Sequence, residues 1–239
     1  SILYKEAIKQ EFSHPVKINF FAAISISLLM LSIIYKESLP SISALFWYIG
    51  VTGHFYLTMH TIAFWINQNQ QLEHSNPAWF IPIVGNVLVP LGGNDLAPME
   101  FLTYFFSIGI FFWIILFSLI LNRIIFHNQM GTKFMPTLFI LIAPPAVGFI
   151  SYIKLFGGLD HFATMLFNLA LFFTLLLAFM YKNFIKIKFF LSWWAFIFPL
   201  SAMTISSMLF WSITHSMALY AFSYFMLFAT TTIVLIVAY

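Results

Sequence analysis

Long apolar runs, separated by short connections that hold the turn-forming and charged residues, make up most of the sequence. A helix needs about 20 apolar residues to cross the hydrocarbon core of a membrane. This criterion predicts eight spans, at residues 17–35, 41–66, 77–91, 97–121, 135–153, 161–181, 189–211 and 215–238. The third run is short because Pro77 and the Gly92-Gly93 turn bound it, so we expect a tilted, irregular span or a re-entrant segment there.

The composition excludes a water-soluble domain. Hydrophobic residues make up 62% of the chain and charged residues only 7%, whereas an ordinary soluble domain carries roughly 25% charged residues. We expect an all-α fold with a single transmembrane channel or transporter domain over residues 1–239, in which 1–15 form a cytoplasmic segment and 16–239 hold the eight spans. The short connections predict antiparallel helical hairpins.

The basic residues predict the orientation of the chain in the membrane. If the N-terminal segment is cytoplasmic, that side holds Lys5, Lys9, Lys17, Arg123, Lys133, Lys182, Lys186 and Lys188. The opposite side then holds only Lys36 and Lys154. Because basic residues concentrate on the cytoplasmic side, both termini are predicted to be cytoplasmic. The basic residues never form a run, so we expect no nucleic-acid partner despite the net charge of +3.

Prolines divide the predicted spans into two kinds. Internal prolines occur in odd-numbered spans, as Pro82 and Pro90 in the third, Pro144 and Pro145 in the fifth and Pro199 in the seventh. A proline removes an amide donor from the helix, and in lipid such backbone is tolerated only against protein or a water-filled cavity. The pattern favours an inner layer of odd spans and an outer, lipid-facing layer of even spans. Prolines that merely kink a helix are the alternative.

Small and polar residues in the odd spans are further candidates for the lining of a pore. Together with the prolines, the candidate set is Ser25, Pro82, Gly85, Asn86, Pro144, Pro145, Ala195, Pro199, Ser201 and Ala202. Small residues also allow close packing of membrane helices, which is the structural alternative for each of them.

Charged residues are absent from the interior of every predicted span. Proton-coupled transporters usually keep an ionisable residue at membrane depth, so a neutral interior favours a channel. Histidine could ligate haem or a metal, but only His54 and His60 lie within a span, and six residues on a helix turn them about 120° apart. With no cysteine and no catalytic triad, we predict no metal, no cofactor and no enzymatic activity.

Phe198 is the one phenylalanine with a distinctive setting. It precedes Pro199 and has Ala195 and Ala202 three and four residues away along the helix. A large ring among small residues at a kink could plug a narrow pore. It could equally pack against the next helix, and local sequence leaves both interpretations open.

Several stretches resemble one known family in the same order along the chain. They are SHPVKINFFAAISISLLML (13–31), NPAWFIPIVGNVLVPLGG (76–93), LIAPPAVGFISY (141–152) and, most specifically, LSWWAFIFPLSAM (191–203). These stretches look like the tellurite-resistance and dicarboxylate-transporter family, which includes bacterial TehA, the plant slow anion channels and a yeast malate permease. The resemblance implies ten helices in five hairpins with quasi-fivefold symmetry, a central pore lined by the first helix of each hairpin, and a homotrimer with one pore per subunit.

The resemblance also implies roles for particular residues. The phenylalanine that occludes the family's pore matches Phe198, which favours Phe198 as a gate. The eight predicted spans match the family's third to tenth helices, so the first hairpin is missing and residues 1–13 resemble the end of its second helix. We therefore expect that the sequence is part of a longer chain.

These inferences predict a gated anion channel of the bacterial inner membrane that passes small inorganic or organic anions through a neutral pore. A carrier or exporter for C4-dicarboxylates such as malate, or for oxyanions such as tellurite or sulfite, is the alternative. A membrane enzyme or haem-binding subunit is the alternative from a different class. The expected partners are the anions, the lipid bilayer and further copies of the chain in a homotrimer.

Overall fold

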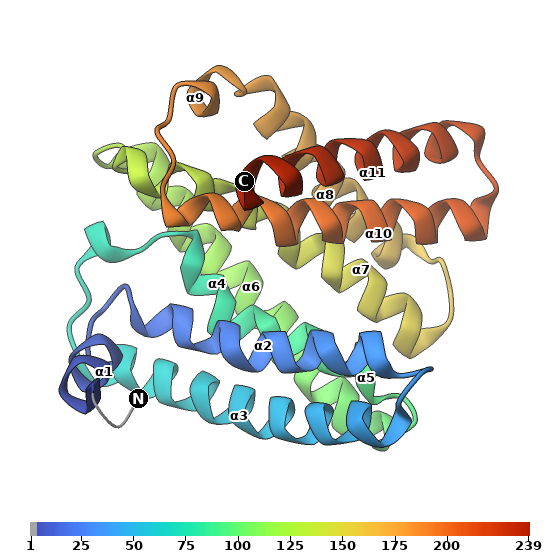
Figure 1. Ribbon diagram of the computed structural model, residues 1–239, viewed down its shortest axis with the longest axis horizontal. Coiled ribbons are helices and arrows are strands. Elements are labelled where there is room, and N and C mark those ends of the chain that lie inside the picture. The colour runs from blue at the N-terminus through green and yellow to red at the C-terminus, as the bar shows by residue number, and fades with distance from the viewer. Residues whose placement is uncertain (1–3) are drawn as a thin grey trace. The chain divides into compact units, whose positions relative to one another are not determined.

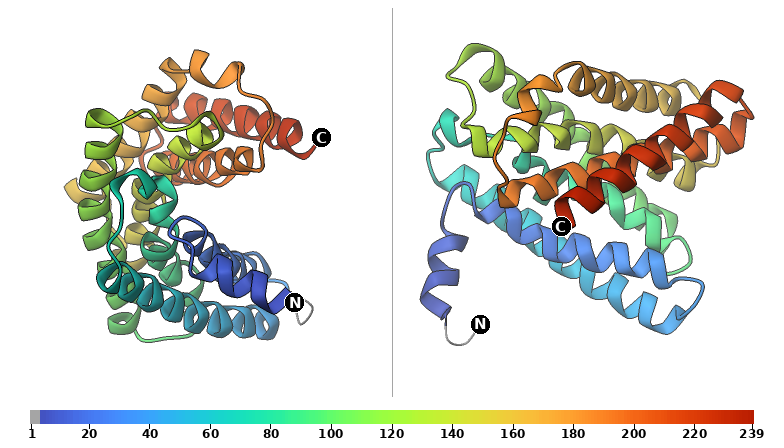
Figure 2. Two further views of the ribbon diagram at one scale, coloured as in Figure 1. Left: turned by 90° about the vertical axis from the view of Figure 1, so that its left-hand side faces the viewer. Right: turned by 45° about the horizontal axis from the view of Figure 1, so that its top comes forward.

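A computed structural model describes residues 4–239, and those residues form helices and turns without a β-strand. Residues 1–3 of the predicted N-terminal segment lie outside the described residues. The helices group into two compact units, one ending at Asn128 and the other beginning at Gln129. The first unit runs from blue to green and the second from green to red in Figures 1 and 2.

The first unit contains three long helices, a short N-terminal helix and a broken segment. Its elements are α1 (Lys5–Phe12), α2 (Ile18–Tyr35), α3 (Pro40–Asn67), η2 (Leu72–His74), η3 (Pro77–Trp79), α4 (Phe80–Val84), η4 (Gly85–Leu88), α5 (Val89–Gly93) and α6 (Met99–Phe126). Helices α2 and α3 lie side by side, and α4, η4 and α5 pack against both α2 and α6 (Figure 1). The connection between α2 and α3 is short, which makes them antiparallel as predicted.

The second unit repeats the alternation of broken and continuous helices. Its elements are η5 (Thr132–Ile142), α7 (Ala143–Phe156), α8 (His161–Phe179), α9 (Lys182–Ile185), η6 (Leu191–Phe196), α10 (Ile197–Thr214) and α11 (Met217–Ala238). Helix α10 pairs with α11 and α7 pairs with α8, and α7 also packs against α10 (Figure 2).

All eight predicted runs are helical, and six of them form helices long and apolar enough to cross a membrane among the described residues. The third run is the short, irregular segment that we expected, built from four successive helical pieces over 77–93. The second run, α3, is 28 residues long but is less apolar than the six because it holds several Ser, Thr and Gly residues and two histidines. The structure thus establishes an all-α polytopic membrane protein.

The prolines lie where a 3₁₀-helical stretch changes into an α-helix. Pro90 is the second residue of α5, Pro144 and Pro145 are the second and third residues of α7, and Pro199 is the third residue of α10. Each of these α-helices directly follows a 3₁₀ stretch, namely η4, η5 or η6. In the first turn of an α-helix the amide hydrogens have no intrahelical acceptor, so proline costs least there.

The 3₁₀ stretches also supply partners for the carbonyl groups that proline leaves behind. An α-helical bond from Pro144 would go to the carbonyl of Ile140, but the amide of Ala143 donates to that carbonyl instead. In the same way Val89 donates to the carbonyl of Asn86, which Pro90 cannot reach. The carbonyls of Asn86 and Ile140 are therefore bonded despite the prolines, because i→i−3 bonding takes over at both sites.

Burial follows the same division into broken and continuous helices. In the segment Pro77–Gly93 every residue is buried except Ile81, which is partly exposed. In the second unit, 61% of the 18-residue apolar stretch within Thr132–Phe156 is buried, as is 44% of the corresponding stretch within Leu191–Thr214. The same fraction is 39% in α8 and 22% in α11. The helices with irregular backbone are thus the ones that protein covers best, as a low-dielectric surrounding requires.

Gly92 and Gly93 serve close packing rather than the turn predicted for them. Both belong to α5 and are buried. A Cβ atom on Gly93 would lie 2.5 Å from Cζ2 of Trp47 and 2.7 Å from Cδ2 of Leu102. The glycines therefore let α5 approach α3 and α6 more closely than any larger residue would permit.

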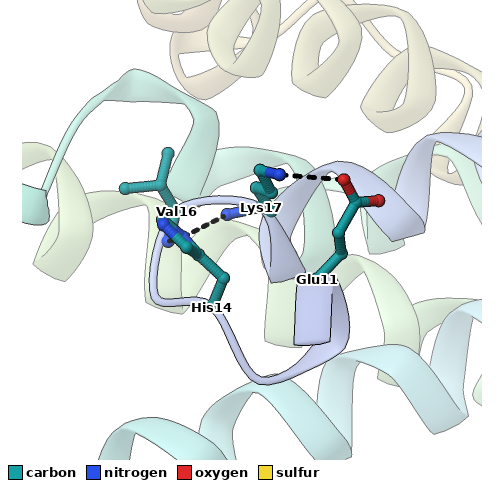
Figure 3. Close-up of polar contacts among 4 residues, drawn as sticks. All are labelled: Glu11, His14, Val16 and Lys17. Atoms are coloured by element: carbon teal, nitrogen blue, oxygen red, sulfur yellow. Dashed lines mark hydrogen bonds and ion pairs between the residues drawn. The ribbon is translucent and has the colours of Figure 1, made fainter. Parts of the chain in front are cut away.

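The turn between α1 and α2 is held by polar contacts of three side chains (Figure 3). The ammonium group of Lys17 pairs with Oε1 of Glu11 at 2.8 Å. Nδ1 of His14 accepts hydrogen bonds from the amides of Val16 at 3.1 Å and Lys17 at 3.4 Å. These amides precede α2, whose N-terminal residue has no side-chain cap of its own, so the His14 ring takes the place of a cap.

Asp160 caps the N-terminus of α8 and makes the stability of this helix depend on pH. Its Oδ1 accepts from the amide of Ala163 at 2.8 Å, and its Oδ2 accepts from the hydroxyl of Tyr152. These donors, the Ala163 amide first, hold the pKa of the Asp160 carboxyl below its usual value. Because the folded pKa is lowered, the stabilisation is present at neutral pH and is lost as the pH falls through the folded pKa.

We predict that Asp160→Ala lowers the thermal unfolding midpoint of the detergent-solubilised protein at pH 7, because the α8 cap and the bond from Tyr152 are both removed. Thermal unfolding followed by circular dichroism measures the effect. The difference between wild type and variant should shrink as the pH falls below the ordinary carboxyl pKa and through the lowered pKa of folded Asp160, because protonation disables the wild-type cap. A difference that stays constant from pH 7 to pH 3 would contradict this account of Asp160.

Candidate functional site

Phe198 is the second residue of α10 and directly follows the change from 3₁₀ to α geometry. Its side chain is partly exposed, whereas the neighbouring Pro199 and Ala202 are buried. Ala195, in η6, and Ser201, one turn into α10, are partly exposed like Phe198. Phe198 thus lies at a backbone junction, with Ala195 and Ala202 three and four residues away along the chain.

The packing of Phe198 differs from that of Phe196, two residues earlier. The Phe196 ring is buried and lies 4.6 Å from Phe139, 5.7 Å from Trp193 and 6.1 Å from Phe184, centroid to centroid. Phe198 makes no ring contact with any aromatic side chain in the part of the chain that the structure describes. Phe196 therefore anchors η6 in the protein, while the Phe198 ring is not held by aromatic packing.

Polar residues further along α10 bond within the bundle. Oγ1 of Thr204 donates to the carbonyl of Leu200 at 2.8 Å and lies 2.9 Å from Oγ1 of Thr230 on α11. Ser206 and Ser207 donate to carbonyls in the preceding turn of their own helix. Each of these hydroxyls has a hydrogen-bond acceptor within α10, and the contact between Thr204 and Thr230 joins α10 to α11.

In the first unit, four predicted lining residues meet at one buried polar cluster on α3. Oγ of Ser25 lies 2.9 Å from Nδ1 of His54. One turn along α3, Oγ1 of Thr58 lies 2.7 Å from the carbonyl of Pro82 and accepts from Nδ2 of Asn86 at 3.0 Å. Both His54 and Asn86 have no exposed surface. We call Ser25, His54, Thr58 and Asn86 the α3 polar cluster.

Gly85 completes this arrangement by letting the His54 ring approach the broken segment. A Cβ atom on Gly85 would lie 2.5 Å from Cε1 and 2.6 Å from Nε2 of His54, and 2.9 Å from Cδ1 of Ile26. The first two distances are shorter than any van der Waals contact. Gly85 is therefore required because the His54 ring occupies the space that a side chain would fill, and not because the backbone needs an unusual angle.

Two polar atoms of the α3 polar cluster have no partner among the described residues. They are Nε2 of His54 and Oδ1 of Asn86, both shielded from the surface. A buried polar atom without a hydrogen bond costs about 1–3 kcal/mol, so the cluster is less than fully satisfied by the chain's own groups. Among the described side chains, no group of three or more His, Asp or Glu residues is arranged to hold a metal ion.

The sequence predicted Ser25, Pro82, Gly85 and Asn86, but not that α3 brings them together. From the sequence, Thr58 had no predicted role, and His54 was expected on an outer, lipid-facing helix. A signal was present in the spacing, because Gly50, His54 and Thr58 recur every four residues and share one buried face of α3. Pro144 and Pro145 are buried in the second unit, at the start of α7.

We predict that Gly85→Ala destabilises the protein by about 1–3 kcal/mol, because the added methyl group overpacks the site against the His54 ring. The free energy of unfolding in detergent measures the loss. Gly53→Ala is the matched control, since a Cβ there meets only Cβ of Ser25, at 3.8 Å.

A double variant tests the stated contact. If the His54 ring causes the strain, combining Gly85→Ala with His54→Ala should cost less than the sum of the two single changes. Strict additivity of the two changes would show that His54 is not the group that resists the methyl.

The whole chain is similar to known proteins. The profile of a family described as voltage-dependent anion channel matches residues 1–239. The S-type anion channel SLAH2 of Arabidopsis thaliana is 30% identical over 205 residues, which cover 84% of this chain and 40% of the relative. The chain spans less than half the length of this plant channel and of SLAH3, another from the same plant, of which 34% is covered.

Two microbial relatives are covered more fully. An uncharacterized transporter of Methanocaldococcus jannaschii is 26% identical over 238 residues, or 89% of this chain and 68% of the relative. The tellurite resistance protein TehA homolog of Haemophilus influenzae is 26% identical over 232 residues, or 92% of this chain and 68% of the relative. The resemblance noted in the sequence is confirmed, and the chain belongs to the SLAC1 family of voltage-dependent anion channels, a family of channels and transporters rather than enzymes.

Proposed function

We propose that this protein is a gated anion channel of the bacterial inner membrane, in which the Phe198 ring occludes a neutral pathway for small inorganic or organic anions. The observation that carries the proposal is the partly exposed ring of Phe198, unsupported by aromatic packing, beside a proline at the start of α10. Membership of the anion-channel family supplies the class of ion. Both termini are proposed to be cytoplasmic, on the distribution of Lys and Arg.

The distribution of charge within the helices supports a neutral pathway. Glu100 lies in the first turn of α6, Arg123 in its last turn and Lys154 in the last turn of α7. No Lys, Arg, Asp or Glu stands in the middle of a long described helix. Without a fixed cation to bind an anion tightly, passage would depend mainly on the free energy of removing water from each anion, so weakly hydrated anions should pass more easily.

The contrast between Phe196 and Phe198 supports the gate. A gating side chain must move without unfolding its helix, whereas an anchoring side chain must stay. Phe196 is buried among three other rings and suits the second role. Phe198 lacks such contacts among the described residues and has small neighbours on its helix, so a change of rotamer would disturb little packing.

For the lining of the pathway we propose the broken, proline-bearing segments together with α2, as parts of one eight-span transmembrane domain. In the second unit the proposal assigns Pro144, Pro145, Ala195, Ser201 and Ala202 to the lining. In the first unit Ser25, Pro82, Gly85 and Asn86 bond to or pack on α3, so we propose that they hold the irregular backbone of the lining in place. The oligomer proposed from the family resemblance is a homotrimer.

A carrier for dicarboxylates or oxyanions is the second candidate, and His54 favours it. Coupled carriers commonly keep a titratable group at membrane depth. His54 lies near the middle of α3, and its Nε2 has no partner among the described residues. The names of two relatives, one called a transporter and one a tellurite resistance protein, are compatible with this alternative.

We predict that Phe198→Ala raises anion conductance, because removing the ring removes the barrier. If the ring contributes about 1.4 kcal/mol to the barrier, the current should rise roughly tenfold. Voltage-clamp recording of the purified protein in planar bilayers measures the current. Phe172→Ala is the matched control, since Phe172 is an exposed residue of α8 in the same unit and should leave the current unchanged. Equal currents in wild type and Phe198→Ala, at equal oligomeric state, would refute the gate.

Reversal potentials separate the two candidate functions. For the channel we expect shifts toward the Nernst potentials of chloride and nitrate, with nitrate more permeant because it is less hydrated, and no dependence on a proton gradient. Saturable malate uptake that follows the proton gradient and disappears in His54→Gln would instead favour the carrier.

A further inference from the structure

The connection between α8 and η6 is unlike a water-exposed loop. Residues 180–190 read MYKNFIKIKFF, with three lysines, one asparagine and otherwise apolar side chains. Most of these apolar groups are uncovered, since Ile185 is 71% exposed and Phe189 is 60% exposed. The segment joins two candidate membrane spans, one ending at Phe179 and the next beginning at Leu191, so we expect it at the membrane surface. Short α9 forms its first half (Figure 1).

The charge on this connection has one sign. Lys182, Lys186 and Lys188 are all exposed, and the sequence contains no Asp or Glu after Asp160. Asp160 itself caps the opposite end of α8. A fourth basic residue, Lys133, stands nearby because its carbonyl accepts a hydrogen bond from Oγ of Ser192. These lysines therefore have no acidic side chain of their own unit at this end of α8.

The connection is also held in place by the protein. Ile187 is buried, and the Phe184 ring lies 5.1 Å from that of Phe139. Nε1 of Trp193 donates to the carbonyl of Lys188 at 3.2 Å. The lysines are thus presented on a formed surface rather than on a chain without contacts, which lowers the ordering cost of binding a ligand.

We propose that this surface, made of Lys182, Lys186 and Lys188 with Ile185, Phe189 and Leu191, binds the headgroups of anionic lipids. The ammonium groups would pair with lipid phosphates, and the exposed apolar side chains would enter the acyl region beside them. An acidic soluble protein fits less well, because Leu191 is 82% exposed and Phe179 is 84% exposed at the ends of two candidate membrane spans. The surface would lie on the side predicted to be cytoplasmic, and it does not depend on the channel activity.

Native mass spectrometry of the detergent-solubilised full chain, titrated with dioleoyl phosphatidylglycerol, tests the proposal. Each lysine near a charged lipid surface should contribute roughly a fivefold gain in affinity. Replacing Lys182, Lys186 and Lys188 together by Gln should therefore weaken phosphatidylglycerol binding by roughly a hundredfold and leave phosphatidylcholine binding unchanged. Replacing the same three by Arg should retain the binding, which separates a loss of charge from misfolding.

The matched control removes three positive charges elsewhere on the same predicted side. Lys5, Lys9 and Lys17 alternate with Glu6 and Glu11, and Lys17 is already paired with Glu11. Their joint replacement by Gln should change phosphatidylglycerol binding little. An equal loss in both triple variants, or no loss in the first, would overturn the proposal. Displacement of the lipid by an equal concentration of glycerol phosphate would overturn the lipid assignment in favour of a simple phosphate site.

Discussion

The need to satisfy every backbone amide and carbonyl inside the protein is the constraint on which the rest of this structure depends. Lipid offers no hydrogen bonds, so irregular backbone within a membrane must find partners in its own chain. Here the proline-bearing segments begin as 3₁₀ helices, and the amides of Val89 and Ala143 bond the carbonyls that Pro90 and Pro144 cannot reach. The same segments are the best covered by protein. The 3₁₀ bonding of these segments and their cover by protein are two results of one requirement.

The α3 polar cluster shows the same constraint acting through side chains. The carbonyl of Pro82 lies 2.7 Å from the Thr58 hydroxyl, and that hydroxyl accepts from the Asn86 amide at 3.0 Å. A side chain of the continuous helix α3 thus bonds to the irregular backbone beside it. This role explains why α3 is more polar than the other long helices and why it is not among the six most apolar ones. Its polar residues bond inside the unit beside buried apolar residues such as Trp47, while Tyr56 and Met59 on α3 remain exposed.

The sequence was sufficient to predict the class of fold and the positions of the eight apolar helical runs, because apolar runs and their breaks are local signals. The short helices α1 and α9 lie outside those runs and were not predicted by the apolar pattern. Prolines indicated correctly which segments would be irregular. What local sequence could not predict was the compensation at Pro144, because a 3₁₀ stretch from Thr132 to Ile142 is longer than such helices usually are. The hydrogen-bond partners of the buried polar side chains could not be predicted from local sequence either. Ser25 and His54 are distant in sequence, so only the packing of α2 on α3 brings them within 2.9 Å.

The position of Phe198 has a consequence for how a gate could work. An aromatic pair contributes about 0.5–1.5 kcal/mol beyond the area it buries, so freeing the Phe196 ring from three such contacts would be costly. Phe198 gives up none of these contacts when it turns, in the part of the chain described here. Pro199 also removes the amide that would tie this turn of α10 to η6. In the proposed gate, a firmly anchored ring two residues before an unanchored one would let the Phe198 side chain move while its helix stays in place, so that a path would open without exposing backbone to lipid.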